Sequence, residues 1–121
     1  MRNKEEKGYH KLLLWQRLRE FLKLVYLLTD KLPESENFGL KSQMRRCMVS
    51  VISNFVEGYL KTSKKYKSSF LEISNTSLLE LEAQGEICRI LDYWTEENYG
   101  NFEQKRGEIG FLLFRYKKAI S

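Results

Sequence analysis

Residues 43–58 read Gln43-Met-Arg-Arg-Cys-Met-Val-Ser-Val-Ile-Ser-Asn-Phe-Val-Glu-Gly58, near the middle of the chain, and combine apolar and polar residues at helical spacings. The apolar residues of this stretch recur at spacings of three and four, the pattern of a helix buried along a broad face. They are Met44, Cys47, Met48, Val51, Ile52, Phe55 and Val56. Ser50, Asn54 and Glu57 form a polar line along one side of the same helix. Such a line faces water, another subunit or a ligand.

Size and composition indicate one folded all-α domain, residues 1–121. Hydrophobic residues make up 42% of the chain and charged residues 31%, and Pro33 is the single proline. Leu, Lys and Glu outnumber Val and Ile, which favours helices over strands. No apolar run approaches the roughly 18 residues of a membrane span, and the N-terminus does not resemble a signal peptide. We therefore expect a cytoplasmic protein with no membrane partner, in which Cys47 and Cys88 are small buried hydrophobic residues.

The net charge of +5 is unevenly distributed along the chain. Residues 41–67 carry seven Lys or Arg and one Glu, whereas residues 68–104 carry one Arg and eight acidic residues. Residues 105–121 are basic again, with five Lys or Arg and one Glu. Basic surface of this kind attracts polyanions such as nucleic acid, and an acidic helix can meet the basic surface of a second copy.

Four helical patterns follow one another, and we expect helices at about residues 9–32, 40–60, 64–94 and 96–119. Pro33 cannot continue the first helix. Thr62 or Ser63 can cap the third helix, and Thr95 caps the fourth. Four helices joined by short connections favour an antiparallel up-down four-helix bundle.

The two later helices carry less regular patterns. In the third helix we expect one inward face, formed by Phe70, Ile73, Ser77, Leu81, Cys88 and Leu91, with the small residues Ser74 and Gly85. Its acidic outer side faces solvent or another subunit, and consists of Glu72, Glu80, Glu82 and Glu86. In the fourth helix a heptad seam with a single charge is predicted, through Tyr99, Phe102, Arg106, Ile109, Leu113, Tyr116 and Ile120. Gly58 either caps the second helix or lets a neighbour pack closely.

Aromatic residues also lie off these stripes. Phe111, Phe114, Tyr59 and Tyr93 fall outside the main apolar faces of their helices. Because this is more apolar surface than one bundle core absorbs, we expect subunit contacts and hence a homo-oligomer.

The sequence lacks the residues that most catalytic sites require. His10 is the single histidine, so a di-iron bundle, a His-based triad and a zinc site cannot be built. No glycine-rich phosphate loop is present. Glu57 could serve as a buried acid, although pairing with Arg45 or Arg46 of another helix or subunit is the plainer interpretation. We therefore assign no catalytic residue, no metal ligand and no cofactor, and expect a protein that is not an enzyme.

Nucleic-acid binding agrees better with the residues available. Cations bind phosphates and aromatic rings bind bases, and Tyr59 and Tyr66 are interleaved with a run of cations. The candidate binding residues are Arg45, Arg46, Lys61, Lys64, Lys65, Lys67, Arg115, Lys117 and Lys118. One chain offers few contacts, but a ring of copies would multiply them.

Several short motifs share their residues and spacing with one known family. They are Leu14-Trp15-Gln16, Gly39-Leu40-x-x-Gln43-x-x-Arg46, Ser50-Val51-x-x-Asn54-x-x-Glu57-Gly58, Phe70-Leu71-x-x-Ser74 and Ser77-Leu78-x-Glu80-Leu81-Glu82. In these motifs, over residues 9–94, the chain resembles the small four-helix-bundle proteins encoded by intervening sequences in bacterial large-subunit ribosomal RNA genes. That family is related to the accessory variability proteins of diversity-generating retroelements. Its members often carry Pro-Ala where this chain has Ile52-Ser53, and the change favours an uninterrupted second helix.

The resemblance implies a bundle that assembles into a barrel-like homopentamer with a positively charged surface. The retroelement relatives bind nucleic acid and associate with a reverse transcriptase. No catalytic residues are established for the family. The matching residues are therefore interpreted as a structural and assembly signature, in which Arg46, Asn54 and Glu57 satisfy one another or a neighbouring helix. The full signature is Arg46, Ser50, Asn54, Glu57 and Gly58.

Three functions follow as hypotheses. The leading one is a basic oligomeric scaffold that binds RNA or DNA and acts as an accessory to a reverse transcriptase. The alternative is a protein-interaction module encoded in a ribosomal RNA intervening sequence, for which nucleic-acid binding is incidental. The third, a hydrolase or nuclease that uses Glu57, has the least support from the residues present.

Overall fold

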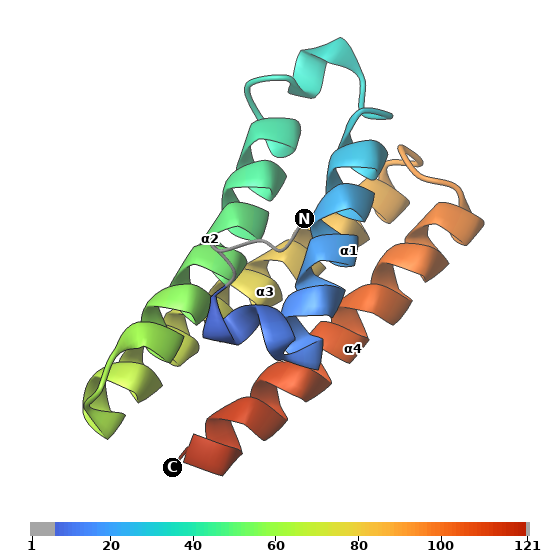
Figure 1. Cartoon of the computed structure of the whole chain (residues 1–121). Helices are drawn as coiled ribbons and strands as arrows, with labels where there is room; N and C mark the ends of the chain where they lie inside the picture. Colours follow the sequence, from blue (N-terminus) through green and yellow to red (C-terminus); the bar gives the residue numbers. More distant parts are fainter. Residues whose placement is uncertain (1–6, 121) are drawn as a thin grey trace, which may run out of the picture.

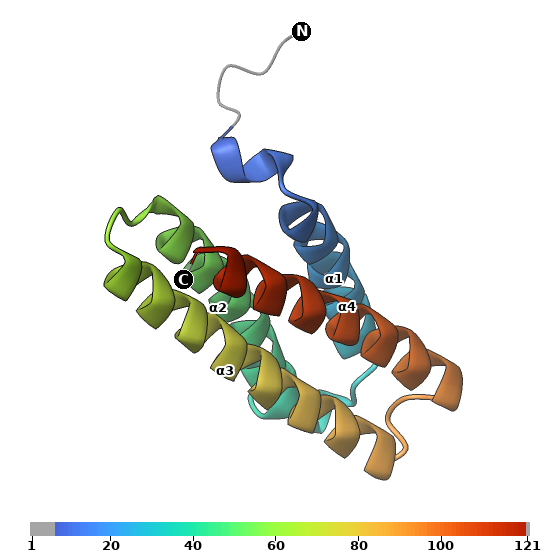
Figure 2. The same ribbon diagram turned by 90° about the horizontal axis from the view of Figure 1, so that it is seen from below.

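The computed structural model describes residues 7–120, which form a bundle of four long helices without a strand (Figure 1). The elements in chain order are the 3-10 helix η1 (Gly8–Lys11), α1 (Leu13–Thr29), the 3-10 helix η2 (Glu34–Glu36), α2 (Leu40–Leu60), α3 (Lys64–Ile90) and α4 (Glu96–Ile120). Neighbouring long helices run in opposite directions, and α4 closes the bundle against α3 and α1 (Figures 1 and 2). The all-α prediction is confirmed for these residues, and α2 has the predicted bounds without interruption. None of the described helices is long and apolar enough to cross a membrane.

The first and third helices differ from their predicted bounds. The predicted helix 9–32 is divided at Leu12, whose backbone is extended (φ −77°, ψ 140°), and α1 ends at Thr29. The predicted helix 64–94 ends instead at Ile90. Asp92 adopts a left-handed conformation (φ 59°), and the amide of Tyr93 donates to the carbonyl of Cys88 (2.9 Å). This is the Schellman motif that terminates helices, and Asp92 takes the place usually held by glycine.

The predicted helix starts are confirmed at two caps. Ser63 Oγ accepts a hydrogen bond from the amide of Tyr66 (3.3 Å), which fixes the start of α3. Thr95 Oγ1 accepts one from the amide of Asn98 (3.0 Å), just before α4. The first turn of α4 is acidic and its last turn is basic, the arrangement that the helix dipole favours.

The core confirms most of the predicted stripes. In α2 the fully buried apolar side chains are Met44, Met48, Val51 and Phe55. In α4 they are Phe102, Ile109 and Leu113. Arg106, the charge within that seam, is held by Glu103 (2.8 Å) and by Glu82 of α3 (3.3 Å).

The predicted face of α3 was partly wrong. The predicted members Ser77, Leu81 and Cys88 are buried, as are the small residues Ser74 and Gly85. Ile73 and Leu91 are instead 47% and 50% exposed, and the core is filled by Leu71 and Leu78. Apolar residues occur on two sides of this long helix, so its periodicity alone could not identify the inward side.

Two glycines allow helices to approach closely. Gly58 is buried inside α2, and a Cβ atom there would lie 3.2 Å from the Leu71 side chain and 3.2 Å from the carbonyl oxygen of Lys67. Close packing is therefore its role, because the helix continues to Leu60 beyond it. At Gly85 a Cβ atom would lie 2.3 Å from the Phe102 ring, so the absence of a side chain there lets α4 pack closely on α3.

The antiparallel arrangement gives the bundle two chemically different ends (Figure 1). One end holds the α1–α2 and α3–α4 connections, and we call it the connection end. Its acidic residues are Asp30, Glu34, Glu36, Asp92, Glu96 and Glu97. The opposite end holds the α2–α3 corner and the last turns of α4, and we call it the basic end. Its cations are Lys61, Lys64, Lys65, Lys67, Arg115, Lys117 and Lys118.

Candidate nucleic-acid interface

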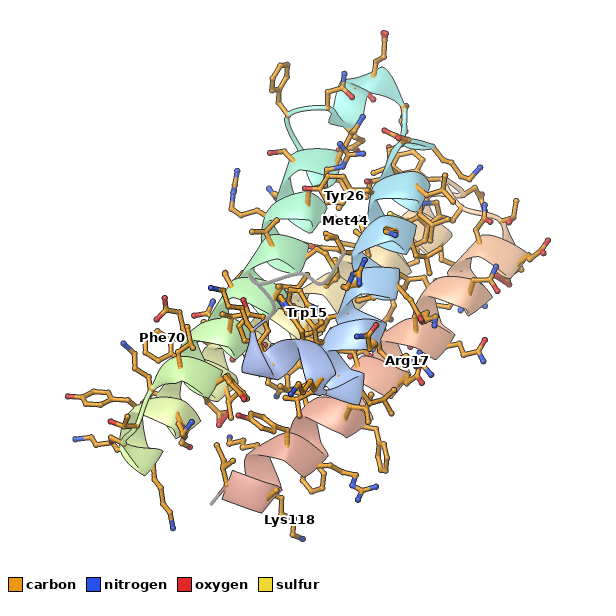
Figure 3. All side chains as sticks on the ribbon, in the orientation of Figure 1. Trp15, Arg17, Tyr26, Met44, Phe70 and Lys118 are labelled. Carbon is orange, nitrogen blue, oxygen red and sulfur yellow. The ribbon has the colours of Figure 1, made fainter. Side chains whose placement is uncertain are left out.

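The basic end unites segments that are far apart in the sequence. The ring of Tyr116 in α4 lies 5.6 Å from that of Phe55 and stacks 6.4 Å from that of Tyr59, both in α2. An ion pair between Lys117 and Glu72 joins α4 to α3. Seven of the nine predicted binding residues therefore lie at one end of the bundle. Figure 3 shows Lys118 pointing away from the bundle there.

η1 brings further residues to this end that are not among the predicted binding residues. The ring of Tyr9 packs edge-on against those of Tyr59 (5.6 Å) and Trp15 (5.0 Å). This contact places η1, with the exposed Lys11, beside the C-terminal half of α2. The signal available in the sequence was the basic balance of the first 11 residues. The sequence around Tyr9 does not indicate that its ring packs against Tyr59, which lies 50 positions further on.

The cations of the basic end differ in how far they are engaged within the chain. Lys64 and Lys65 are exposed, and their side chains form neither a hydrogen bond nor an ion pair with any other residue in the range 7–120. Lys61 pairs with Glu57 at 3.7 Å, where both side chains are exposed. Lys67 donates to the carbonyl oxygen of Tyr59 (2.9 Å) and so caps the C-terminus of α2. Lys64 and Lys65 are thus the most available cations of the α2–α3 corner.

Arg45, a predicted binding residue, lies near the connection end, where its hydrogen bonds stabilise the fold. Its guanidinium donates to Thr29 Oγ1 (2.9 Å), to the carbonyl oxygen of Tyr26 (3.0 Å) and to Asp30 Oδ1 (2.9 Å). It also lies over the Tyr26 ring, 4.3 Å from its centre (Figure 3 labels Tyr26). Arg45, together with Lys41, lowers the pKa of the Asp30 carboxyl. These bonds fasten α2 to the C-terminus of α1.

Arg46, the ninth predicted binding residue, lies on a groove between α2 and α3 instead of at the basic end. The groove has a volume of about 310 Å³ and is lined by Gln43, Arg46, Cys47, Ser50, Ser77, Glu80 and Gln84. Ser50 Oγ and Ser77 Oγ are hydrogen-bonded at 2.7 Å across it. The side-chain oxygen of Gln84 is buried there, with no hydrogen-bond partner among residues 7–120.

The polar line of α2 is satisfied differently from the prediction. Asn54 donates to the carbonyl oxygen (2.9 Å) and the hydroxyl (3.0 Å) of Ser50, one turn earlier in the same helix. Arg46 makes a long bond to Ser42 (3.4 Å), and Glu57 pairs with Lys61. Arg46, Asn54 and Glu57 therefore do not satisfy one another within residues 7–120, so this half of the prediction was wrong, and contacts with a helix of another copy stay a prediction. Glu57 is exposed, so it is not a buried acid.

The thiols and the histidine form no recognisable reactive centre. Burial raises the pKa of Cys88 to about 12, and its sulfur lies 3.7 Å from that of Met44. Burial also raises the pKa of Cys47. His10 stacks on Trp15 at 5.1 Å and accepts a hydrogen bond from the amide of Lys7. Between residues 7 and 120 there is no cluster of three or more His, Cys, Asp or Glu that could hold a metal ion.

Comparison with known proteins places the chain in a family. The family of 23S rRNA-intervening sequence proteins matches it over residues 10–115. The chain belongs to this family. A crystal structure of a protein of unknown function from the S23 ribosomal protein family of Bacteroides thetaiotaomicron superposes with a TM-score of 0.78 at 24% identity, over 88% of this chain and 96% of that one. That similarity supports the fold. No curated protein matches the chain.

Proposed function

We propose that this 23S rRNA-intervening sequence protein is a non-enzymatic oligomeric scaffold that binds RNA or DNA through its basic end. The observation that carries the proposal is the meeting of the α2–α3 corner and the end of α4, which concentrates cations from two distant segments. Lys64 and Lys65 have no acidic partner among the described residues. A cluster of this kind repels itself unless a polyanion neutralises it. Phosphate groups are the anions that such a surface recognises without regard to sequence.

Assembly into a homo-oligomer, a pentamer by the resemblance, belongs to the same proposal. Ile73, Ile87 and Ile90 expose 47%, 42% and 75% of their surface along α3. A groove of about 430 Å³ between α1 and α4 includes Leu24 and Leu27 in its lining. Apolar residues on α3 and an apolar groove elsewhere on the chain suit a head-to-tail ring. Such a ring would bring several basic ends to one polyanion and raise the avidity.

A second candidate function uses the α2–α3 groove instead. Signature residues line it, and the unpartnered oxygen of Gln84 leaves a hydrogen bond for a bound group to complete. In this alternative the groove docks a protein such as a reverse transcriptase, and nucleic-acid binding is incidental. Retention of a co-encoded polymerase in a nuclease-treated pull-down would favour it, above all if Glu80→Lys abolishes the retention and Lys64→Glu does not.

The proposal is tested by titrating binding to a structured RNA with salt. The double variant Lys64→Glu/Lys65→Glu should bind at least about tenfold more weakly, and the slope of log affinity against log salt should become less steep by about 2. The matched control is Arg19→Glu/Lys31→Glu, which makes the same change in net charge at exposed cations outside the basic end and outside the α1–α4 groove. Light scattering should give both variants the mass of the unaltered protein.

Three results would contradict the proposal. Absence of binding at low salt, or an affinity that does not change with salt, would remove the electrostatic mechanism. Equal weakening by the two double variants would remove the basic end as the binding surface. Divalent-metal-dependent cleavage of the RNA that Glu57→Gln abolishes would show that the protein is an enzyme.

A further inference from the structure

Two phenylalanines on the outer side of α4 are unusually exposed. Phe111 and Phe114 expose 58% and 62% of their surface and take no part in the core. Each has a cation one helical turn further on. The guanidinium carbon of Arg115 lies 5.7 Å from the centre of the Phe111 ring, and Lys118 Nζ lies 5.8 Å from the centre of the Phe114 ring. Phe111, Phe114, Arg115 and Lys118 therefore form a mixed aromatic and cationic stripe, which we call the α4 stripe.

The same pairing recurs on α3 near the basic end. Lys61 Nζ lies 5.2 Å from the centre of the Phe70 ring. Tyr66, beside the available Lys64 and Lys65, is 56% exposed. Phe70 is half-buried, and Figure 3 shows it on the outer side of the bundle. The basic end thus offers exposed rings and cations together on two helices.

The charges of the α4 stripe limit which kind of partner can bind to it. A second copy packing the apolar residues of its α3 onto Phe111 and Phe114 would have to place its exposed Glu80 or Glu86 against Arg115 and Lys118, because these cations are costly to bury without anionic partners. A strand of nucleic acid supplies both partners, since each nucleotide carries a π face and a phosphate. In a duplex the base faces are already stacked on one another, so the rings would have nothing to bind.

We propose, resting on the nucleic-acid binding proposed above, that the ligand of the basic end is single-stranded and that its bases stack on Phe111 and Phe114. Arg115 and Lys118 neutralise the adjoining phosphates. The two rings start three residues apart on the helix, about 4.5 Å along its axis. This is slightly more than the 3.4 Å per nucleotide of a strand in a duplex, so consecutive bases reach both rings after modest unstacking.

The test compares three ligands of equal length, about 16 nucleotides, by fluorescence anisotropy. They are oligothymidylate, the same oligomer with its central bases removed, and a duplex. The unaltered protein should bind oligothymidylate about a hundredfold more tightly than the abasic oligomer, because two rings each stack on a base. Phe111→Leu/Phe114→Leu, which keeps apolar bulk without a π face, should lower oligothymidylate affinity about tenfold per ring and leave the other two affinities unchanged. Phe38→Leu is the matched control, because Phe38 is 99% exposed near the connection end.

Several outcomes overturn this inference. Equal affinity of the unaltered protein for oligothymidylate and the abasic oligomer would exclude stacking. Unchanged oligothymidylate binding by the double variant would exclude these two rings, and a change in its mass by light scattering would make the stripe a contact between copies. Salt-dependent binding of all three ligands with equal affinity removes only the single-strand inference. Failure to bind any of them at low salt removes the proposed function as well.

Discussion

The two ends of the bundle use their cations differently. At the connection end Lys41, Arg45 and Arg89 have acidic partners. Arg45 and Lys41 both reach Asp30, at 2.9 and 3.3 Å, and Arg89 binds Glu96 through two nitrogens, at 3.0 and 3.2 Å. At the basic end Lys64 and Lys65 have no such partner within residues 7–120.

The comparison separates stability from recognition. Charges that are paired and hydrogen-bonded hold α1, α2 and the α3–α4 connection in place. Charges left together without counter-charges repel one another and contribute nothing to folding, so they stay available for a polyanion. Substitutions of the paired charges at the connection end should therefore change the free energy of unfolding, and substitutions of the unpaired lysines at the basic end should change affinity.

The largest expected effect on stability is at Trp94. This side chain is 4% exposed, packs 5.1 Å from the Phe102 ring and donates its indole N–H to the carbonyl oxygen of Leu28 (2.9 Å). Trp94→Ala should lower the free energy of unfolding by about 4 kcal/mol, measured by chemical denaturation. Tyr66→Ala at the basic end is the matched aromatic truncation and should change it by less than about 0.5 kcal/mol. Similar losses for the two would mean that the basic end is also structural.

The second largest effect on stability is expected at Arg45. Its substitution should also separate stability from RNA affinity most clearly. Arg45→Met removes the bonds to Thr29, Tyr26 and Asp30, and should lower the free energy of unfolding by about 2 kcal/mol. Its affinity for RNA, measured where the variant is fully folded, should fall by less than a factor of about two. Lys64→Met should show the reverse, with unchanged stability and weaker binding. A strong loss of affinity in the folded Arg45→Met protein would return this residue to the binding surface.

A third prediction concerns close packing at the basic end. At Gly58 an added Cβ would lie 3.2 Å from the Leu71 side chain and from a backbone oxygen that cannot move without shifting α3. Gly58→Ala should lower the free energy of unfolding by about 1 kcal/mol, since overpacking outweighs the better helix propensity of alanine. The control is Gly107→Ala in α4, where the added Cβ has no atom within 4 Å and should stabilise by up to about 1 kcal/mol. A stabilising Gly58→Ala would show that the corner packs loosely.

Much of the fold could be predicted from the sequence because local signals agree with it. The stripe of α2 and the caps at Ser63 and Thr95 are properties of neighbouring residues, and all three are confirmed. The end of α3 depends on the left-handed backbone conformation of Asp92, and an aspartate in the sequence does not by itself predict that conformation. The inward face of α3 depends on which neighbours surround it, and these come from other helices.

The sequence predicted which cations could form the candidate site, but not how they are arranged in space. The lysines of residues 61–67 form a local cluster, so the corner was recognisable. The engagement of Arg45 with Asp30 and of Lys117 with Glu72 depends on partners 15 and 45 positions away. The α4 stripe was readable in principle, because Phe111 with Arg115 and Phe114 with Lys118 both have the spacing of one helical turn.

The smallest expected effect is the pH dependence of the connection end. Hydrogen bonds from Arg45 and Lys41 lower the pKa of Asp30 below its ordinary value of 3.8. The stabilisation from the ionised Asp30 is therefore complete above pH 3.8 and declines as the pH falls through that value toward the folded-state pKa. Asp30→Asn should be less stable than the unaltered protein at pH 7, and the difference should shrink as the pH falls below 3.8. Glu34→Gln, whose exposed carboxylate has no ion pair within the described chain, should show no such convergence. A difference that stays constant down to pH 2 would mean that Asp30 acts through the shape of its turn, and the paired charges of this end would then contribute less to the fold than the comparison requires.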